Sequence, residues 1–263
     1  MSGIRKPSSI ARHSNLPLLG RSRLMSFYQR RATRLDPELP RPQLAAFLPH
    51  QSWRWISSYT RQMLRPRYGP YPVYEGSREN GIYPLRSTSG EGVVRISIAS
   101  DWANGPQESA QVAEAMAAGA PDYTIHLGDI YYVGDDSEVR ENFLGVAATR
   151  FSPVAWPKGA VGTFALPGNH EMYGGGGSYF TKVLEYCETG EGGPQRASYF
   201  CLESEHWRIL GLDTGYNSVG LPVLGWIPGV NQLRWVHADC RMEDGLIAWL
   251  HETVRPQERR KAT

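Results

Sequence analysis

Polar side chains follow three apolar runs in the middle of the chain, at Asp101, at Asp129 and at Asn169 with His170. In open α/β sheets, groups at the carboxyl ends of neighbouring parallel strands meet at one edge. We therefore expect these residues to converge, although they are 28 and 40 residues apart along the chain. Two carboxylates, an amide oxygen and a nearby phenol form an oxygen-rich pocket that suits hard or borderline metal ions. One carboxylate can also bridge two cations about 3.5–4 Å apart.

The elements that would position these groups alternate between strand and helix patterns. β-Branched or apolar runs predict strands at 93–100, 123–129 and 161–170. Between them, an Ala-rich stretch predicts a helix at 104–121, and a stretch with an acidic start predicts another at 135–150. This order is typical of βαβ units and predicts a largely parallel sheet.

The C-terminal third continues with shorter elements. A short helix is predicted at 178–187, followed by a hairpin at 197–215 that turns near Ser204. Two further helical pieces are predicted around 231–238 and 244–254.

The N-terminal region differs in charge from the rest of the chain. Residues 1–67 carry 13 Lys and Arg against two acids, a net of +11, which leaves a net of −9 for the remainder. Residues 1–35 have the composition of a tail, 41–64 predict a short helical segment, and 66–90 predict a linker or irregular strand segment. A basic arm of this kind can steer phosphorylated substrates, contact anionic lipid or bind nucleic acid non-specifically. A solvated leader that packs against the acidic body is the alternative.

Composition indicates an ordinary globular protein, with 41% hydrophobic and 21% charged residues. No run approaches the roughly eighteen apolar residues of a membrane helix, and the basic first thirty residues contain no apolar core typical of a signal peptide. Cys187, Cys201 and Cys240 have unrelated spacings that suit neither a disulfide framework nor a zinc cluster. We expect buried free thiols and, by default, a cytoplasmic location.

Taken together, the three motifs are similar to those of the calcineurin-like metallophosphoesterases, and most closely to those of the purple acid phosphatase branch. The residues that carry this resemblance are Ser100-Asp101-Trp102, Gly128-Asp129-Ile130-Tyr131-Tyr132 and Gly168-Asn169-His170-Glu171. The resemblance covers residues 91–263 and implies an α/β fold of the αββα sandwich type, with residues 1–90 as an N-terminal extension and linker.

The resemblance also implies a role for each site residue. Asp101 would bind the first metal ion, Asp129 would bridge both ions, and Tyr132 would bind the first ion as a phenolate. Asn169 would bind the second ion through its side-chain oxygen. His170 would not be a ligand, but would face the phosphoryl group and stabilise or protonate the leaving oxygen. The implied cofactors are two divalent or mixed-valence ions of iron, manganese or zinc.

The first motif departs from the pattern of many relatives, which have a histidine ligand where this chain has Ala103. A Tyr132 ligand would replace that histidine, so the two features agree. Glu171 is expected to orient its loop rather than to take part in chemistry.

Two later family motifs, which resemble Val-x-x-His and Gly-His-x-His, do not occur in this sequence. The later histidines lie in other contexts, namely His170, His206, His237 and His251. The first metal therefore keeps three of four expected ligands and the second keeps two of four. These absences predict a C-terminally incomplete domain with impaired activity: a truncated product, a short form with another role, or a chain completed by a partner.

Other candidates have a structural and a functional interpretation. His126 is expected in the core, and Asp213 is expected to form a structural bond near the site. Gly174–Gly177 predicts a flexible loop, since no Lys-Ser/Thr pair follows to make a phosphate-binding loop. Trp102 and Tyr173 can either line a substrate cleft or pack.

The sequence thus predicts a metal-dependent phosphoesterase that hydrolyses phosphate mono- or diesters by a dinuclear metal-hydroxide mechanism. A non-catalytic metal-binding or interaction module that retains the front half of the fold is the alternative. Nucleic-acid binding through residues 1–67 is a third, less favoured possibility.

Overall fold

The computed structural model describes a set of residues that excludes most of the first 67. These residues are 57, 60–62, 68–75, 80–89, 92–102, 106–130, 133–147, 153–219 and 239–258. The predicted tail at 1–35 and the helical piece at 231–238 lie outside the described residues, as does nearly all of the segment at 41–64.

The first sheet contains the three strands that precede the polar motifs. Its strands are β2 (Ile96–Ala99), β3 (Tyr123–His126) and β4 (Gly162–Ala165), hydrogen-bonded in the order β2-β3-β4. Both pairings are parallel, with Ile96 opposite Tyr123 and Tyr123 opposite Gly162. The predicted parallel sheet is confirmed, and each strand is shorter than its apolar run.

Helices α3 (Pro106–Ala118) and α4 (Asp136–Asn142) connect these strands. Asp135 caps α4 by accepting hydrogen bonds from the backbone N–H groups of Ser137 and Glu138, each at 3.0 Å. The prediction that this helix reaches residue 150 is wrong. Gly145 has a φ of +69° and its Cβ position lies 2.7 Å from the Ala155 Cβ, so the chain turns away from the helix there.

The second sheet combines a hairpin with an early strand. Its strands are β1 (Ile82–Pro84), β5 (Phe200–Glu203) and β6 (Arg208–Gly211), in the order β1-β5-β6. β5 and β6 are antiparallel, which confirms the hairpin, and β1 runs parallel to β5. β1 lies within 66–90, where a linker or irregular strand segment is predicted, and before the domain boundary predicted at residue 91.

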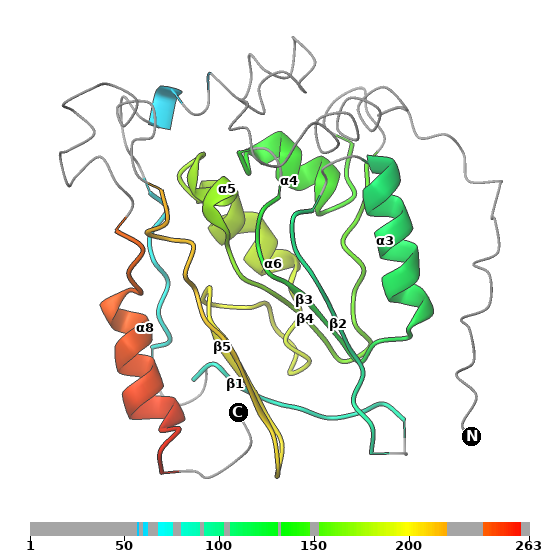
Figure 1. The fold of residues 1–263 in the computed structure, drawn as a ribbon, viewed down its shortest axis with the longest axis vertical. Coiled ribbons are helices and arrows are strands. Elements are labelled where there is room, and N and C mark those ends of the chain that lie inside the picture. Colours follow the sequence, from blue (N-terminus) through cyan, green and yellow to red (C-terminus); the bar gives the residue numbers. More distant parts are fainter. Residues whose placement is uncertain are drawn as a thin grey trace, which may run out of the picture.

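The remaining helices follow β4 along the chain, and the last of them lie outside the second sheet (Figure 1). They are α5 (Asn169–Met172), η2 (Tyr179–Val183), α6 (Leu184–Tyr186), α8 (Asp244–Trp249) and η5 (Leu250–Val254). The short helix at 178–187 and the piece at 244–254 are thereby confirmed, with one π-helical turn in each.

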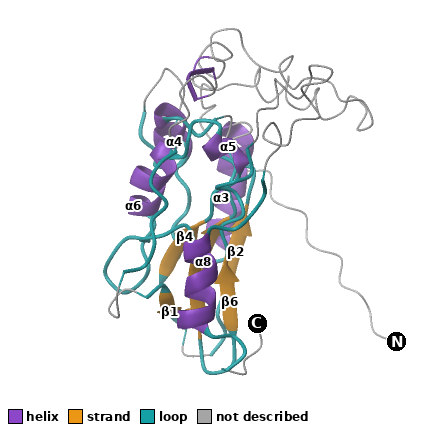
Figure 2. Ribbon diagram, turned by 90° about the vertical axis from the view of Figure 1, so that its left-hand side faces the viewer, coloured by secondary structure: helices purple, strands orange, loops and turns teal. Residues whose placement is uncertain are grey.

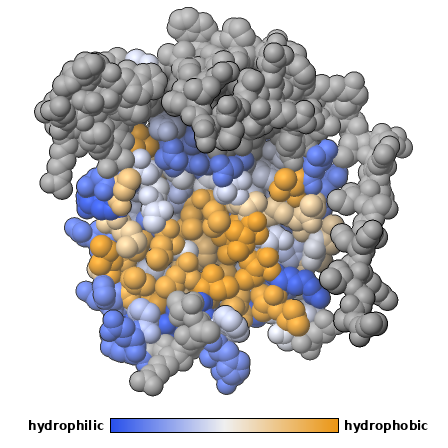
Figure 3. All heavy atoms as spheres, viewed as in Figure 1, coloured by the Kyte–Doolittle hydropathy of each residue, from blue (hydrophilic) through white to orange (hydrophobic). Residues whose placement is uncertain are grey.

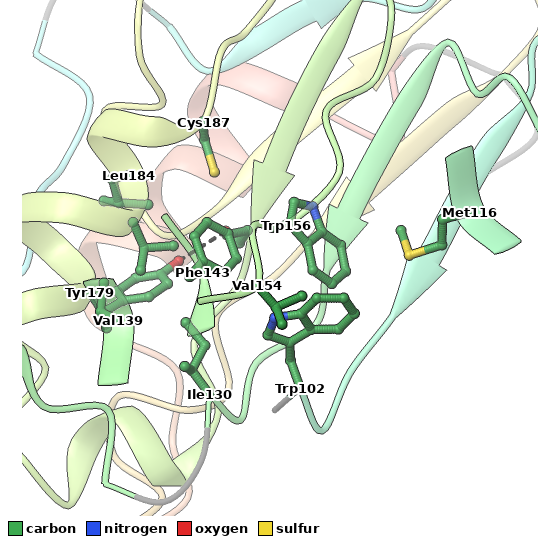
Figure 4. Close-up of a cluster of buried hydrophobic side chains, with 12 residues drawn as sticks. Trp102, Met116, Ile130, Val139, Phe143, Val154, Trp156, Tyr179, Leu184 and Cys187 are labelled. Carbon is green, nitrogen blue, oxygen red and sulfur yellow. Dashed lines mark hydrogen bonds between the residues drawn. The ribbon is translucent and has the colours of Figure 1, made fainter. Parts of the chain in front are cut away.

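Three apolar clusters separate four layers of structure. Between the sheets, Phe164 of β4 packs on Phe200 of β5 with ring centroids 4.5 Å apart, and on Tyr83 of β1 at 5.3 Å. A second cluster lies between the first sheet and its helices (Figure 4). A third lies between the second sheet and α8 with η5. Helix, sheet, sheet, helix is the predicted αββα sandwich, which is confirmed.

One side of the sandwich is apolar at its surface. β2 and β6 lie on the same side of the two sheets (Figure 2), and among the described strands each pairs along one edge only. Hydrophobic side chains gather on this face (Figure 3). Ile98 of β2 is 55% exposed.

None of the described helices is long and apolar enough to cross a membrane. All three cysteines are free thiols. Cys187 and Cys201 are buried as predicted, whereas the prediction is wrong for Cys240, which is exposed.

Candidate metal centre

Asp101 and Asp129 leave neighbouring strands through the same unusual turn. Their φ angles are +56° and +65°, in the left-handed region that residues with a Cβ seldom adopt. The two exits stay paired beyond the sheet, since Asp101 N–H donates to the Gly128 carbonyl at 3.1 Å and Trp102 N–H donates to the Asp129 carbonyl at 2.8 Å. Backbone strain of this kind persists only where surrounding contacts enforce it, and it is common at functional sites.

The third motif is joined to the second by a direct hydrogen bond. Asn169 and His170 begin α5, directly after the exit from β4. The backbone N–H of His170 donates to Oδ1 of Asp129 at 3.1 Å. The structure therefore brings together the backbone segments that carry Asp101, Asp129 and Asn169 with His170.

Glu171 is fully buried, and its carboxylate connects these loops. Its carboxylate accepts hydrogen bonds from the N–H groups of Gly168 at 2.6 Å, Asp129 at 3.0 Å and Ile130. Burial raises the pKa of Glu171 to about 7, and the nearby Asp129 charge adds to this, although the backbone donors act in the opposite direction. The prediction that Glu171 orients the loop is confirmed.

Asn169 is oriented by Tyr173, one helical turn further along the chain. Its Nδ2 donates to the Tyr173 phenol oxygen at 2.8 Å, which assigns the other amide atom, Oδ1, as the oxygen that could bind a metal. The Tyr173 ring also meets the His170 ring edge-on, with centroids 4.9 Å apart. Of the two interpretations for Tyr173, the structure favours a place beside the site. Its i, i+4 spacing from Asn169 is a signal that the sequence already contained.

Trp102 packs in the core instead of lining a cleft. Only 2% of its surface is exposed, and it meets Trp156 edge-on with centroids 4.9 Å apart. Its indole N–H donates to the Asn142 carbonyl. Trp102 thus anchors the Asp101 exit to the apolar cluster drawn in Figure 4.

Asp213 forms structural hydrogen bonds, as predicted. It is buried and accepts from the N–H groups of Gly215 and Tyr216, each at 2.9 Å, and from the Ser198 hydroxyl. Burial raises the pKa of Asp213 to about 6. His126 lies in the core, also as predicted.

The glycine-rich stretch, for which a flexible loop is predicted, forms a tight turn that ends α5. Gly175 and Gly176 are buried and have φ angles of +82° and +73°. Their N–H groups donate to the carbonyls of Met172 and Glu171, each at 2.9 Å. Gly69 N–H donates in turn to the Gly175 carbonyl at 2.8 Å, which joins an upstream segment to this turn.

Of the later histidines, His206 lies in the exposed turn between β5 and β6, 3.9 Å from Glu205. His251 is exposed on η5. His237 lies outside the described residues, and so does Tyr132, whose role as a ligand stays a prediction.

The side chains at the strand exits offer the carboxylates of Asp101 and Asp129 and the amide oxygen of Asn169. Oxygen ligands of these types suit a hard or borderline cation. Oδ1 of Asp129 accepts one hydrogen bond from the His170 N–H, and the carboxylate keeps further lone pairs for a metal. Within the described part of the chain, no three side chains of His, Cys, Asp or Glu are grouped so that they could hold a metal. The described donors are thus suitable in chemistry and fewer than a complete two-metal site needs.

The model of the calcineurin-like phosphoesterase family matches residues 94–258. Because this match spans more than half of the chain, the protein belongs to that family. No curated protein and no solved structure matches it. Membership supports a metal-dependent phosphoesterase in general and a phosphate ester as the substrate class.

Proposed function

We propose that this protein is a hydrolase of phosphate mono- or diesters that uses two metal ions at the carboxyl edge of the first sheet. The family match supports the reaction class. The observation that carries the site is the hydrogen-bonded contact between three strand exits, from Asp101 to Gly128 and from His170 to Asp129. The resemblance to the purple acid phosphatase branch supports the assignment of two ions of iron, manganese or zinc.

In this proposal each side chain has one task. Asp101 and Tyr132 would hold the first ion, Asp129 would be a ligand of both ions, and Asn169 would hold the second ion. When bound, such ions make water acidic enough to ionise near neutral pH and neutralise charge on the phosphoryl group. His170 faces the phosphoryl group and transfers a proton to the leaving oxygen.

The set of ligands limits the expected rate. The resemblance assigns two residues of this sequence to the second ion, Asp129 and Asn169, since neither a Gly-His-x-His nor a Val-x-x-His motif occurs in it. Loss of one transition-state donor costs roughly 10²–10³ in rate, and loss of a metal ion should cost at least as much. We therefore expect slow hydrolysis by this chain.

A non-catalytic metal-binding or interaction module is the second candidate. The absence of a group of three His, Cys, Asp or Glu ligands among the described residues favours it. Metal stoichiometry separates the candidates, because the enzyme requires two ions per chain and the module requires one or none.

The test combines Mn²⁺ titration calorimetry with an aryl-phosphate assay on the wild-type chain and on Asp129→Asn. Asp244→Asn is the matched control, because the Asp244 side chain is 97% exposed on α8. We expect Mn²⁺ binding and slow hydrolysis that Asp129→Asn abolishes and Asp244→Asn leaves unchanged. One bound ion or none, with no hydrolysis that depends on Asp129, would refute the two-metal enzyme and favour the module.

A further inference from the structure

His126 ends β3 inside an apolar cluster and is fully buried. Its ring meets Trp156 edge-on at 4.7 Å and Phe143 edge-on at 5.3 Å. Burial lowers the pKa of His126 to about 3, so the imidazole is neutral at neutral pH. A leucine of similar volume would fill this position without the cost of burying a polar ring, so packing alone does not account for a histidine.

The two ring nitrogens have different surroundings. Nδ1 accepts the backbone N–H of Gly128 at 3.0 Å, whereas Nε2 is buried without a hydrogen-bond partner. An acceptor at Nδ1 requires the proton to be on Nε2 in the neutral ring. The hydrogen bond that Nδ1 accepts is therefore with the residue before Asp129.

Gly128 is the residue on which both carboxylate exits depend. Its φ is +98°, and a Cβ there would lie 2.2 Å from the Gly168 nitrogen, so only glycine fits. Its carbonyl accepts the N–H of Asp101 at 3.1 Å, and it is bonded covalently to Asp129. A contact that fixes Gly128 therefore acts on both predicted ligands.

We propose that His126 is a positioning residue of the metal centre: its neutral Nδ1 holds the Gly128 amide and thereby fixes the backbone at Asp101 and Asp129. This inference rests on the proposed phosphoesterase function. The imidazole touches neither substrate nor metal and acts only through Gly128. Mutation of residues that orient metal ligands by hydrogen bonds commonly lowers metal affinity by about 10–100-fold.

Two substitutions separate positioning from packing. His126→Leu keeps the volume and removes the acceptor. His126→Asn loses volume, but its side-chain oxygen can occupy the position of Nδ1 and accept the Gly128 N–H. If His126 only packs, His126→Leu should resist urea better than His126→Asn. If it positions the site, His126→Asn should retain more amide protection at Gly128 and more Mn²⁺ affinity than His126→Leu.

The first measurement is amide hydrogen exchange of the metal-free full chain. We expect the Gly128 and Asp101 amides to exchange roughly tenfold faster in His126→Leu and to remain close to wild type in His126→Asn. The second measurement is Mn²⁺ affinity by calorimetry, where His126→Leu should bind about 10–100-fold more weakly and His126→Asn should recover most of the loss.

If a folded His126→Leu variant has wild-type amide protection at Gly128 and Asp101 and wild-type Mn²⁺ affinity, the inference is wrong. The proposed function is then unaffected. If the wild-type chain binds no Mn²⁺, the proposed function fails, and the positioning role fails with it. If His126→Leu does not fold, His126→Gln replaces it, because its amide group reaches the Nε2 position and leaves Gly128 without an acceptor. Wild-type exchange in that variant would likewise refute the role of His126.

Discussion

Two buried carboxylates organise the loops beside the candidate metal centre, one for each sheet. Glu171 follows β4 of the first sheet, and Asp213 follows β6 of the second. The two loops are in close contact, since a Cβ on Gly215 would lie 2.3 Å from the Pro167 carbonyl oxygen. Burial raises the pKa of both groups, to about 7 for Glu171 and about 6 for Asp213.

The two carboxylates differ in which parts of the chain they join. Asp213 accepts two N–H groups from its own turn and one hydroxyl from Ser198, 15 residues upstream. Glu171 accepts N–H groups of Asp129 and Ile130, which are 42 and 41 residues away and follow another strand. Asp213 thus shapes mainly a local turn, whereas Glu171 joins two strand exits and with them the predicted ligands.

The largest effect should come from Glu171→Leu. This change leaves three backbone N–H groups without their acceptor, and each such group costs about 1–3 kcal/mol, so unfolding free energy should fall by roughly 3 kcal/mol or more. Urea denaturation at pH 7 measures the loss. Glu185→Leu on the exposed side of α6 is the control and should change stability little. A loss under about 1 kcal/mol for Glu171→Leu would show that these hydrogen bonds do not hold the exits together.

Asp213 should make its contribution through pH. Because its folded pKa of about 6 lies above the ordinary value of 3.8, the folded state holds a proton that the unfolded state releases between these values. Its contribution to stability is therefore complete below about pH 4 and is lost as the pH rises through about 6. Over this window the change is about 2–3 kcal/mol, at about 1.4 kcal/mol per pKa unit.

Asp213→Asn tests this prediction, because the amide is neutral throughout and can still accept from the turn. Urea midpoints at pH 4, 5, 6 and 7 should show wild type losing stability relative to Asp213→Asn as the pH rises. Parallel curves for the two proteins would mean that Asp213 titrates at its ordinary value.

A smaller effect is expected from Tyr173→Phe, which removes the acceptor for Asn169 Nδ2. Tyr186→Phe is the matched control, because the Tyr186 phenol donates to the Trp156 carbonyl at 2.7 Å and is similarly half-buried. Each change should cost about 1 kcal/mol of unfolding free energy. Only Tyr173→Phe should also weaken Mn²⁺ binding. Equal Mn²⁺ affinities in the two variants would show that Tyr173 does not support the metal site.

The strand exits were predictable because their pattern is local. Asp101, Asp129 and Asn169 each end an apolar run, and the parallel-sheet rule then places them at one edge. The hydrogen-bond partners of Glu171 and the role of His126 were harder to see, because those partners are backbone N–H groups that no side-chain pattern reveals. The early strand β1 was predictable only as one alternative for 66–90, since it is three residues long and depends on β5 for its pairing.

The smallest effect on folding should come from the apolar face along β2. Ile98 is 55% exposed there, and β2 pairs only with β3 among the described strands. Exposed apolar strand edges favour self-association, and an added lysine opposes it.

Ile98→Lys should change unfolding free energy by no more than about 0.5 kcal/mol, as is usual for surface positions. It should nevertheless reduce concentration-dependent association in sedimentation velocity. Ile247→Lys, an exposed apolar position on α8, should leave association unchanged. Equal association of wild type and Ile98→Lys would show that this face does not drive contacts between chains.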